Sequence, residues 1–181
     1  MRTIVCVPHN TLRTPAQAVH RFDRRLARMI SEMRATLLAT RHPKGVGLAA
    51  PQIGEPWRVF ITKPNEQSDI RVFINPEIVK RSREQTDGVP ERGNKLEGCL
   101  SIPNIWGKVK RAKTLTFRYQ DEKGNIHVEE FTGFLATIIQ HEADHTNGIL
   151  FTQRVLEQKG KLYQTSKDSD GKEILEGISL P

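Results

Sequence analysis

Residues 132–148 have the sequence TGFLATIIQHEADHTNG, which carries the strongest structural signal in the chain. Apolar side chains recur in it every three to four residues, which is the spacing of one helix face. They are Leu135, Ile138, Ile139 and Ala143. Thr132 is a suitable N-cap, and Asn147 followed by Gly148 is a typical C-terminal stop. The pattern predicts a helix from Phe134 to Asn147 with its apolar face buried in a core.

Two histidines in this predicted helix, His141 and His145, are four residues apart, and Glu142 follows the first of them. Side chains four residues apart lie on one helix face about one turn from each other, so both imidazoles can reach the same metal ion. Glu142 can reach a water on that ion without being a ligand itself. Because this pattern is short, the same residues could instead form an exposed polar patch on a helix. The remaining ligands therefore distinguish the alternatives.

Two classes of zinc peptidase combine this pattern with a third ligand further along the chain. In metzincins a Gly three residues after the second His is followed, three residues later, by another His. Gly148 fits this spacing, but Phe151 takes the last position, which excludes the metzincin pattern. A thermolysin-like site needs a downstream Glu, and the polar tail offers candidates without predicting a helix to support them. These candidates are Glu157, Glu173 and Glu176.

Cys99 is the upstream candidate for the third ligand. A thiolate and two neutral imidazoles leave a divalent ion with net positive charge and one open position, which is typical of a catalytic site. Gly98 lets the backbone approach closely at this point. The alternative is that Cys99 is a small buried hydrophobic residue, which is our interpretation of Cys6.

The rest of the chain predicts one more helix and several short strands. Apolar side chains recur at helical spacing between residues 16 and 40, which predicts an N-terminal amphipathic helix. The predicted strands are 57–62, 70–74, 77–82, 114–120 and 126–131, the last two forming a hairpin. Residues 159–181 are polar and interrupted by Gly, which predicts a loose tail. Together these elements predict an α+β fold of mostly antiparallel short sheets packed around the metal-bearing helix.

Length and composition restrict the class of protein. The chain has 181 residues, which suits a single catalytic domain over 1–181. No window approaches the ~20 apolar residues of a membrane span, so we expect neither a membrane protein nor a signal peptide. Two cysteines cannot form a disulfide framework, which favours a reducing compartment such as the cytoplasm. The net charge of +7 is compatible with a nucleic-acid partner, but 6% aromatic residues offer few rings for base stacking.

Three segments together resemble the peptide deformylase family. They are GVGLAAPQ at residues 45–52, EGCLS at residues 97–101 and QHEADH at residues 140–145. They occur in the family's order and spacing, and the similarity extends from about Leu12 to Phe151. The resemblance implies a metal-dependent hydrolase that removes the formyl group from the N-terminal formylmethionine of newly synthesised proteins.

The resemblance also implies the catalytic residues. The metal ligands would be Cys99, His141 and His145. They would bind one divalent ion, usually Fe²⁺ in the cell, with Zn²⁺, Ni²⁺ or Co²⁺ as substitutes. Glu142 would be the general acid/base, taking a proton from a metal-bound water and delivering it to the departing amine nitrogen. The backbone N–H of Leu100 and the side-chain amide of Gln52 would hold the oxyanion.

Other implied residues would bind the peptide. The backbone near Val46 would pair with the incoming chain as an added strand. The Met side chain would enter an apolar pocket on the approach to His141, with Trp106 closing one wall. The complete set of substrate-binding residues would be Gly45, Val46, Gly47, Gly98, Phe134, Thr137, Ile138 and Trp106.

The expected partners are N-formyl-methionyl nascent peptides, with no membrane and no sequence-specific nucleic acid. Two basic clusters favour either weak association with the ribosome or simply solubility. They are Arg24, Arg25 and Arg28 on the first helix, and Lys108, Lys110, Arg111 and Lys113 before the hairpin. Two alternatives stay open. One is a zinc peptidase with a Glu ligand; the other is a basic RNA-binding module with a structural metal, which would need a fourth protein ligand.

Overall fold

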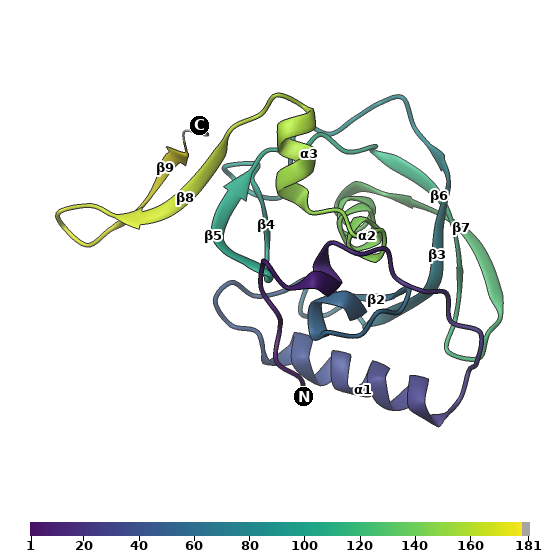
Figure 1. Cartoon of the computed structure of the whole chain (residues 1–181). Coiled ribbons are helices and arrows are strands. Elements are labelled where there is room, and N and C mark those ends of the chain that lie inside the picture. Colours follow the sequence, from purple (N-terminus) through teal and green to yellow (C-terminus); the bar gives the residue numbers. More distant parts are fainter. Residues whose placement is uncertain (179–181) are drawn as a thin grey trace.

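The computed structural model describes residues 1–178. This part of the chain forms two sheets of antiparallel strands, one of five strands and one of four, around a central helix, α2 (Figure 1). The helix α2 (Gly133–Thr146) lies within one residue of its predicted bounds at each end. The predicted α+β fold of mostly antiparallel sheets is therefore confirmed.

The five-stranded sheet has the order β1-β2-β3-β6-β7. Its strands are β1 (Gly47–Ala49), β2 (Val59–Thr62), β3 (Arg71–Arg81), β6 (Thr114–Gln120) and β7 (Ile126–Thr132). The helix α1 (Arg24–Ala39) packs on one face and α2 on the other. Because successive side chains of a strand face opposite sides, Phe60 and Phe73 pack toward α2 whereas Ile61 and Val72 pack toward α1. The strands β1 and β2 and the first half of β3 are thus buried on both faces, and α2 is fixed against them.

The four-stranded sheet has the order β4-β5-β8-β9. Its strands are β4 (Glu97–Cys99), β5 (Ile102–Gly107), β8 (Leu162–Lys167) and β9 (Glu173–Ile178). The short helix α3 (Phe151–Glu157) packs on this sheet through Phe151 and Val155. Two 3-10 turns, η1 (Asn10–Leu12) and η2 (Ala50–Ile53), complete the described structure. Within residues 1–178, no helix is long and apolar enough to cross a membrane.

The C-terminal segment differs from the loose tail predicted for residues 159–181. Strands β8 and β9 form a hairpin with continuous pairing from Leu162↔Ile178 to Lys167↔Glu173, and it projects from the body of the molecule (Figure 1). The hairpin is attached because β8 also pairs with β5, with Tyr163 opposite Trp106. Residues 179–181 lie outside the described part of the chain.

The first helix begins at Arg24, later than the residue 16 predicted. Asp23 caps it, and its side chain accepts two backbone N–H groups of the first turn at 2.9 and 3.1 Å. Upstream, the backbone N–H and C=O of Val19 are both bonded to the Asn75 side chain at 2.8 Å. These bonds hold Val19 out of a helix despite its apolar periodicity. The strands predicted at 70–74 and 77–82 are also one strand, β3, with a register shift at Asn75.

Candidate metal centre

Cys99, His141 and His145 converge at the centre of the molecule, where the end of β4 meets α2. Their ligand atoms all lie within 4.8 Å of one another. The Sγ of Cys99 is 3.2 Å from Nε2 of His145, and the two imidazole rings have centroids 4.9 Å apart. The structure thus brings together the three residues that the sequence indicated as candidate ligands.

The chemistry of this donor set fits a divalent transition metal. Burial alone would raise the pKa of the Cys99 thiol, but the charges of His145 and His141 outweigh burial and lower it to about 5. The Gln52 amide and the Ser101 backbone N–H also donate to the sulfur, at 3.5 and 3.4 Å. Thiolate and imidazole ligands together suit ions such as Fe²⁺, Zn²⁺, Ni²⁺ and Co²⁺. The residues therefore fit one such ion.

Gln52 is fixed beside the sulfur by bonds on both ends of its amide. Its Oε1 accepts the Ala49 N–H at 2.8 Å, and its Nε2 donates to Ser101 Oγ at 3.3 Å. The N-terminal segment braces the same region, because Val5 N–H donates to Gln52 O at 2.9 Å. The 3-10 turn η2 therefore presents an amide donor to the metal site. Cys6, in this N-terminal segment, is exposed, so its interpretation as a buried residue is wrong.

Glu142 is buried next to the ligands, with 4% of its surface exposed. Its Oε2 has no hydrogen-bond partner among residues 1–178. Burial raises the pKa of Glu142 to about 7, although the charges of His141 and His145 partly oppose it. A Cβ at Gly47 would lie 2.3 Å from Glu142 Oε1, so a side chain there would displace the carboxylate. The Gly at 47 is therefore a spatial requirement of Glu142.

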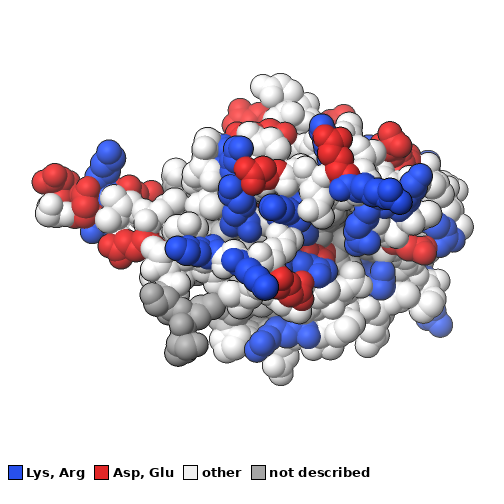
Figure 2. Space-filling view, turned by 90° about the horizontal axis from the view of Figure 1, so that it is seen from above, with Lys and Arg blue, Asp and Glu red and all other residues white. Residues whose placement is uncertain are grey.

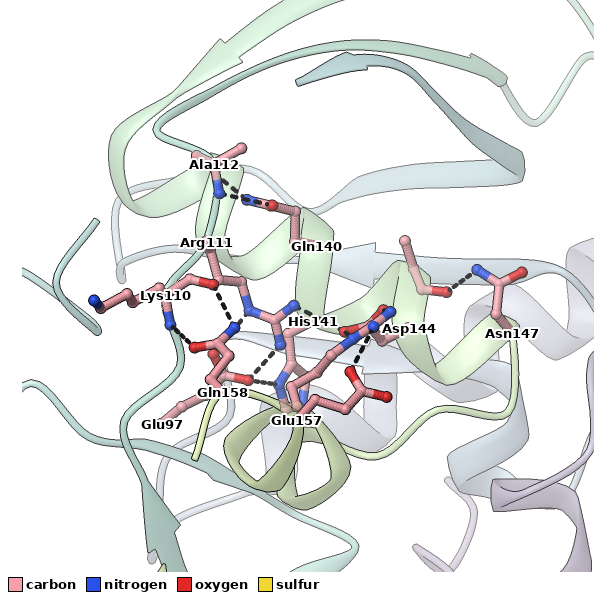
Figure 3. A network of polar contacts seen from close by, with 12 residues as sticks. Glu97, Lys110, Arg111, Ala112, Gln140, His141, Asp144, Asn147, Glu157 and Gln158 are labelled. Atoms are coloured by element: carbon pink, nitrogen blue, oxygen red, sulfur yellow. Dashed lines mark hydrogen bonds and ion pairs between the residues drawn. The ribbon is translucent and has the colours of Figure 1, made fainter. Parts of the chain in front are cut away.

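Arg111 lies at the centre of a buried ionic network behind the ligands (Figure 3). Its guanidinium donates to both oxygens of Glu97, at 2.6 and 3.0 Å, and to Asp144 at 2.8 Å. Glu97 Oε1 is also 2.6 Å from Nδ1 of His141, so the carboxylate fixes the imidazole ring. Burial would raise the pKa of Glu97, but Arg111 and His141 hold it well below its usual range.

The sequence did not reveal this network. Glu97 lies in the EGCLS segment, but its position there predicts no role, and the sequence places Arg111 in a basic cluster. Arg111 is 6% exposed, so its place in a surface cluster is corrected. Its neighbours are held from both sides, since Gln140 bonds the backbone of Ala112 and Gln158 bonds that of Lys110 (Figure 3).

A pocket of about 610 Å³, counting the space open to solvent, lies next to the ligands. It is lined by every residue predicted to bind substrate. These are Gly45, Val46, Gly47, Gly98, Phe134, Thr137, Ile138 and Trp106. The candidate catalytic residues Gln52, Leu100 and Glu142 line it too. Val89 and Arg92 also contribute, although the sequence predicted no role for them.

Two lysines of the second basic cluster form ion pairs with neighbouring carboxylates. On the face shown in Figure 2, Lys and Arg side chains stand among Asp and Glu side chains. Lys108 pairs with Asp87 and Lys113 with Glu84, each across about 3 Å. Part of the second basic cluster is therefore neutralised locally.

Comparison with known proteins follows the same segments. A family model described as polypeptide deformylase matches residues 1–161. Peptide deformylase 1 of Bacillus cereus is 38% identical over 152 residues, which cover 84% of this chain and 90% of the relative. The peptide deformylase of Heliobacterium modesticaldum is 43% identical over 144 residues, covering 80% of this chain and 87% of that protein.

Solved structures agree with these matches. The crystal structure of peptide deformylase from Thermotoga maritima superposes with a TM-score of 0.76 at 36% identity, covering 85% of this chain and 97% of the other. The Met-Ala-Ser-bound class I type b enzyme from Acinetobacter baumannii gives 0.75 at 34% identity, covering 85% and 98%. The hairpin β8–β9 begins at Leu162, just beyond the residues that the family model matches.

Proposed function

The chain belongs to the peptide deformylase family, and we propose that it removes the formyl group from the N-terminal formylmethionine of newly synthesised proteins. The observation that carries this proposal is the convergence of Cys99, His141 and His145 with the buried carboxylate of Glu142 at the base of one pocket. A thiolate and two imidazoles leave a metal position open, and the pocket gives a substrate access to it. The products are formate and a peptide with a free amino terminus.

The three ligands would hold one divalent ion, Fe²⁺ in the cell, with Zn²⁺, Ni²⁺ or Co²⁺ able to replace it. When bound, the ion supplies a Lewis acid that makes water reactive toward an amide at neutral pH. Glu97 supports this arrangement by fixing the ring of His141 through Nδ1. The side chain of Gln52 and the N–H of Ser101 donate to the sulfur of Cys99, and such bonds favour the ionised form that the charges of His145 and His141 stabilise.

Glu142 would move the proton in this reaction. Its carboxylate takes a proton from the attacking water and gives it to the amine nitrogen as the C–N bond of the formamide breaks. The Nε2 of Gln52 and the backbone N–H of Leu100 would donate to the formyl oxygen as it gains negative charge. Gly47 keeps the space that Glu142 needs for both steps.

The peptide would bind along the edge strand β1. The carbonyl of Val46 accepts the Lys63 N–H at 2.7 Å, so it is engaged on the β2 side. Because backbone groups alternate along a strand, those of Gly47 face the free edge. Phe134, Thr137 and Ile138 on α2 would surround the Met side chain. Main-chain pairing of this kind tolerates many sequences after the first residue.

Release of formate from formyl-Met-Ala-Ser tests the proposed function directly. Protein loaded with Fe²⁺, Ni²⁺ or Co²⁺ is expected to release formate, a chelator to stop the release, and added metal to restore it. Unformylated Met-Ala-Ser serves as the control, because its cleavage would indicate a peptidase instead. Absence of formate from all three loaded forms would contradict the proposal.

Gln52→Ala is expected to lower kcat about 100-fold while bound metal is retained, since an oxyanion donor typically contributes about 10²–10³ in rate. Gln52→Glu is the matched variant, because it keeps the shape and loses the N–H donors. Metal content and kcat are measured on the same samples, since Gln52 also contacts the sulfur of Cys99. Unchanged kcat in both variants would remove Gln52 from the mechanism.

We also propose a cytoplasmic location, because nascent chains leave the ribosome there. Weak association with the ribosome through Arg24, Arg25 and Arg28 on α1 stays a prediction. These three side chains are exposed, as such a contact requires.

A further inference from the structure

Arg92 and Trp106 are stacked in one wall of the substrate pocket. The guanidinium carbon of Arg92 lies 5.4 Å from the centroid of the Trp106 ring, and both residues line the pocket. A cation over an aromatic face is attracted by the ring's electron density, which fixes the orientation of the guanidinium. The stack therefore presents a charged group of defined direction to a bound peptide.

The ring beneath Arg92 is itself fixed. Nε1 of Trp106 donates to Oγ1 of Thr165 at 2.8 Å. Thr165 belongs to the hairpin, which lies beyond the segment that the family model matches. The ring also lies close to Gly98, where a Cβ would be 2.6 Å from a ring carbon. The hairpin and β4 thus hold Trp106 in place, and Arg92 rests on a rigid platform.

The guanidinium of Arg92 has no directly bonded carboxylate among the described residues, although the charge of the nearby Glu97 acts on it. Within residues 1–178, the one hydrogen bond of its side chain goes to the carbonyl of Leu96, at 3.2 Å. A second basic residue, Lys44, lines the pocket, and it is paired with Glu66. The two lining carboxylates, Glu97 and Glu142, are both buried beside the ligands. A peptide in the pocket therefore meets a positive charge that still has free N–H donors.

We propose that Arg92 determines specificity by favouring formylated peptides with an acidic side chain at the second or third residue. This inference rests on the proposed function. Formylation removes the charge of the amino terminus, so the charge of the substrate comes from the residues that follow Met. A planar guanidinium with free N–H groups binds a carboxylate through two parallel hydrogen bonds. The guanidinium of Arg92 thus favours a peptide with an acidic residue at this place and disfavours one with a basic residue.

The test compares kcat/KM for matched peptides. The pairs are formyl-Met-Glu-Ser against formyl-Met-Gln-Ser, and formyl-Met-Ala-Glu against formyl-Met-Ala-Gln. In the wild type we expect a Glu/Gln ratio of about 5 in at least one pair, carried by KM and reduced by salt, as for a partly exposed ion pair. Arg92→Gln is expected to bring the ratio to about 1, and Arg92→Lys to keep part of it. A loss of active protein does not change the Glu/Gln ratio, because both peptides of a pair are measured with the same enzyme preparation.

Lys44→Gln is the control, since it removes a positive charge from the same pocket. We expect it to leave the ratio within about twofold of the wild type, because Lys44 is already paired. A wild-type ratio of 1 in both pairs, a ratio that persists in Arg92→Gln, or an equal loss in Lys44→Gln would each overturn the inference. Failure to release formate from any peptide would instead contradict the proposed function.

Discussion

Glu142→Ala is expected to lower kcat for formyl-Met-Ala-Ser by about 10³ while the protein keeps its metal. General acid–base groups typically contribute about 10²–10⁴ in rate, and Glu142 would serve in two successive proton transfers. It is not one of the three converging ligand residues, so metal content should stay at the wild-type level. Paired measurements of kcat and bound metal check the prediction.

For Glu142→Ala we expect little decrease in the free energy of unfolding, unlike the usual result of removing a buried polar side chain. Oε2 of Glu142 has no partner among the described residues, and a buried group without a hydrogen bond costs about 1–3 kcal/mol. Removing it offsets the cavity that Ala leaves. We therefore expect an activity loss with little change in thermal stability, which distinguishes a catalytic role from a structural one.

Gly47→Ala gives an independent approach to the same carboxylate. The added Cβ would overlap Glu142 Oε1, so the carboxylate must move although it is still present. A displacement near 1 Å can cost about 100-fold in rate, so we expect a loss of roughly 10- to 100-fold with metal retained. If Glu142→Ala kept more than a tenth of wild-type kcat, Glu142 could not be the main proton carrier.

The features that the sequence predicted well are those set by local spacing. The helix α2 and the candidate ligands His141 and His145 follow from one periodic segment, and the hairpin of β6 and β7 follows from alternation around a turn. For Cys99 the residues alone left a buried hydrophobic side chain as the alternative, and only the resemblance implied a ligand, because its contact with α2 joins residues 46 positions apart. Local patterns thus located the elements but could not by themselves complete the site.

The features that were missed depend on partners distant in sequence. Arg111 stands in a run of basic residues, which normally indicates a solvated surface, and only Glu97 and Asp144 make its burial favourable. The strands β8 and β9 expose much of both faces, so they lack the alternation that reveals a half-buried strand. The helix α1 starts later than its apolar pattern predicts because the side chain of Asn75, far along the chain, is hydrogen-bonded to the backbone N–H and C=O of Val19.

Arg111→Met is expected to lower the free energy of unfolding by about 3–5 kcal/mol, the largest stability effect that we predict. Removing one partner from a buried ionic network leaves the others buried without compensation. Here the side chains of Arg111, Glu97 and Asp144 are only 5%, 6% and 11% exposed. Met fills a similar volume, so the loss reports the charge and hydrogen bonds more than packing. Denaturant unfolding of metal-loaded protein measures it.

The metal site should weaken in the same variant. Glu97 fixes the ring of His141, and Arg111 fixes both oxygens of Glu97, so losing Arg111 frees the carboxylate and then the imidazole. Loss of such supporting contacts typically costs about 10–100-fold in metal affinity. Competition with a chelator of known affinity measures this change. Arg111→Lys keeps the charge but cannot reproduce three directed bonds, so it should fall between Met and the wild type.

Arg118→Met is the matched control for the stability measurement. Arg118 forms one ion pair with Glu77, and the two side chains are 47% and 57% exposed. Exposed pairs of this kind contribute about 0–1 kcal/mol, so the control should remain close to the wild type. If Arg111→Met cost no more than Arg118→Met, the buried network would contribute neither to stability nor to the placement of His141. Suppose instead that Arg111→Met loses much stability, Arg118→Met does not, and metal binding weakens in Arg111→Met. This result would establish that the buried charge of Arg111 holds the ligands in position.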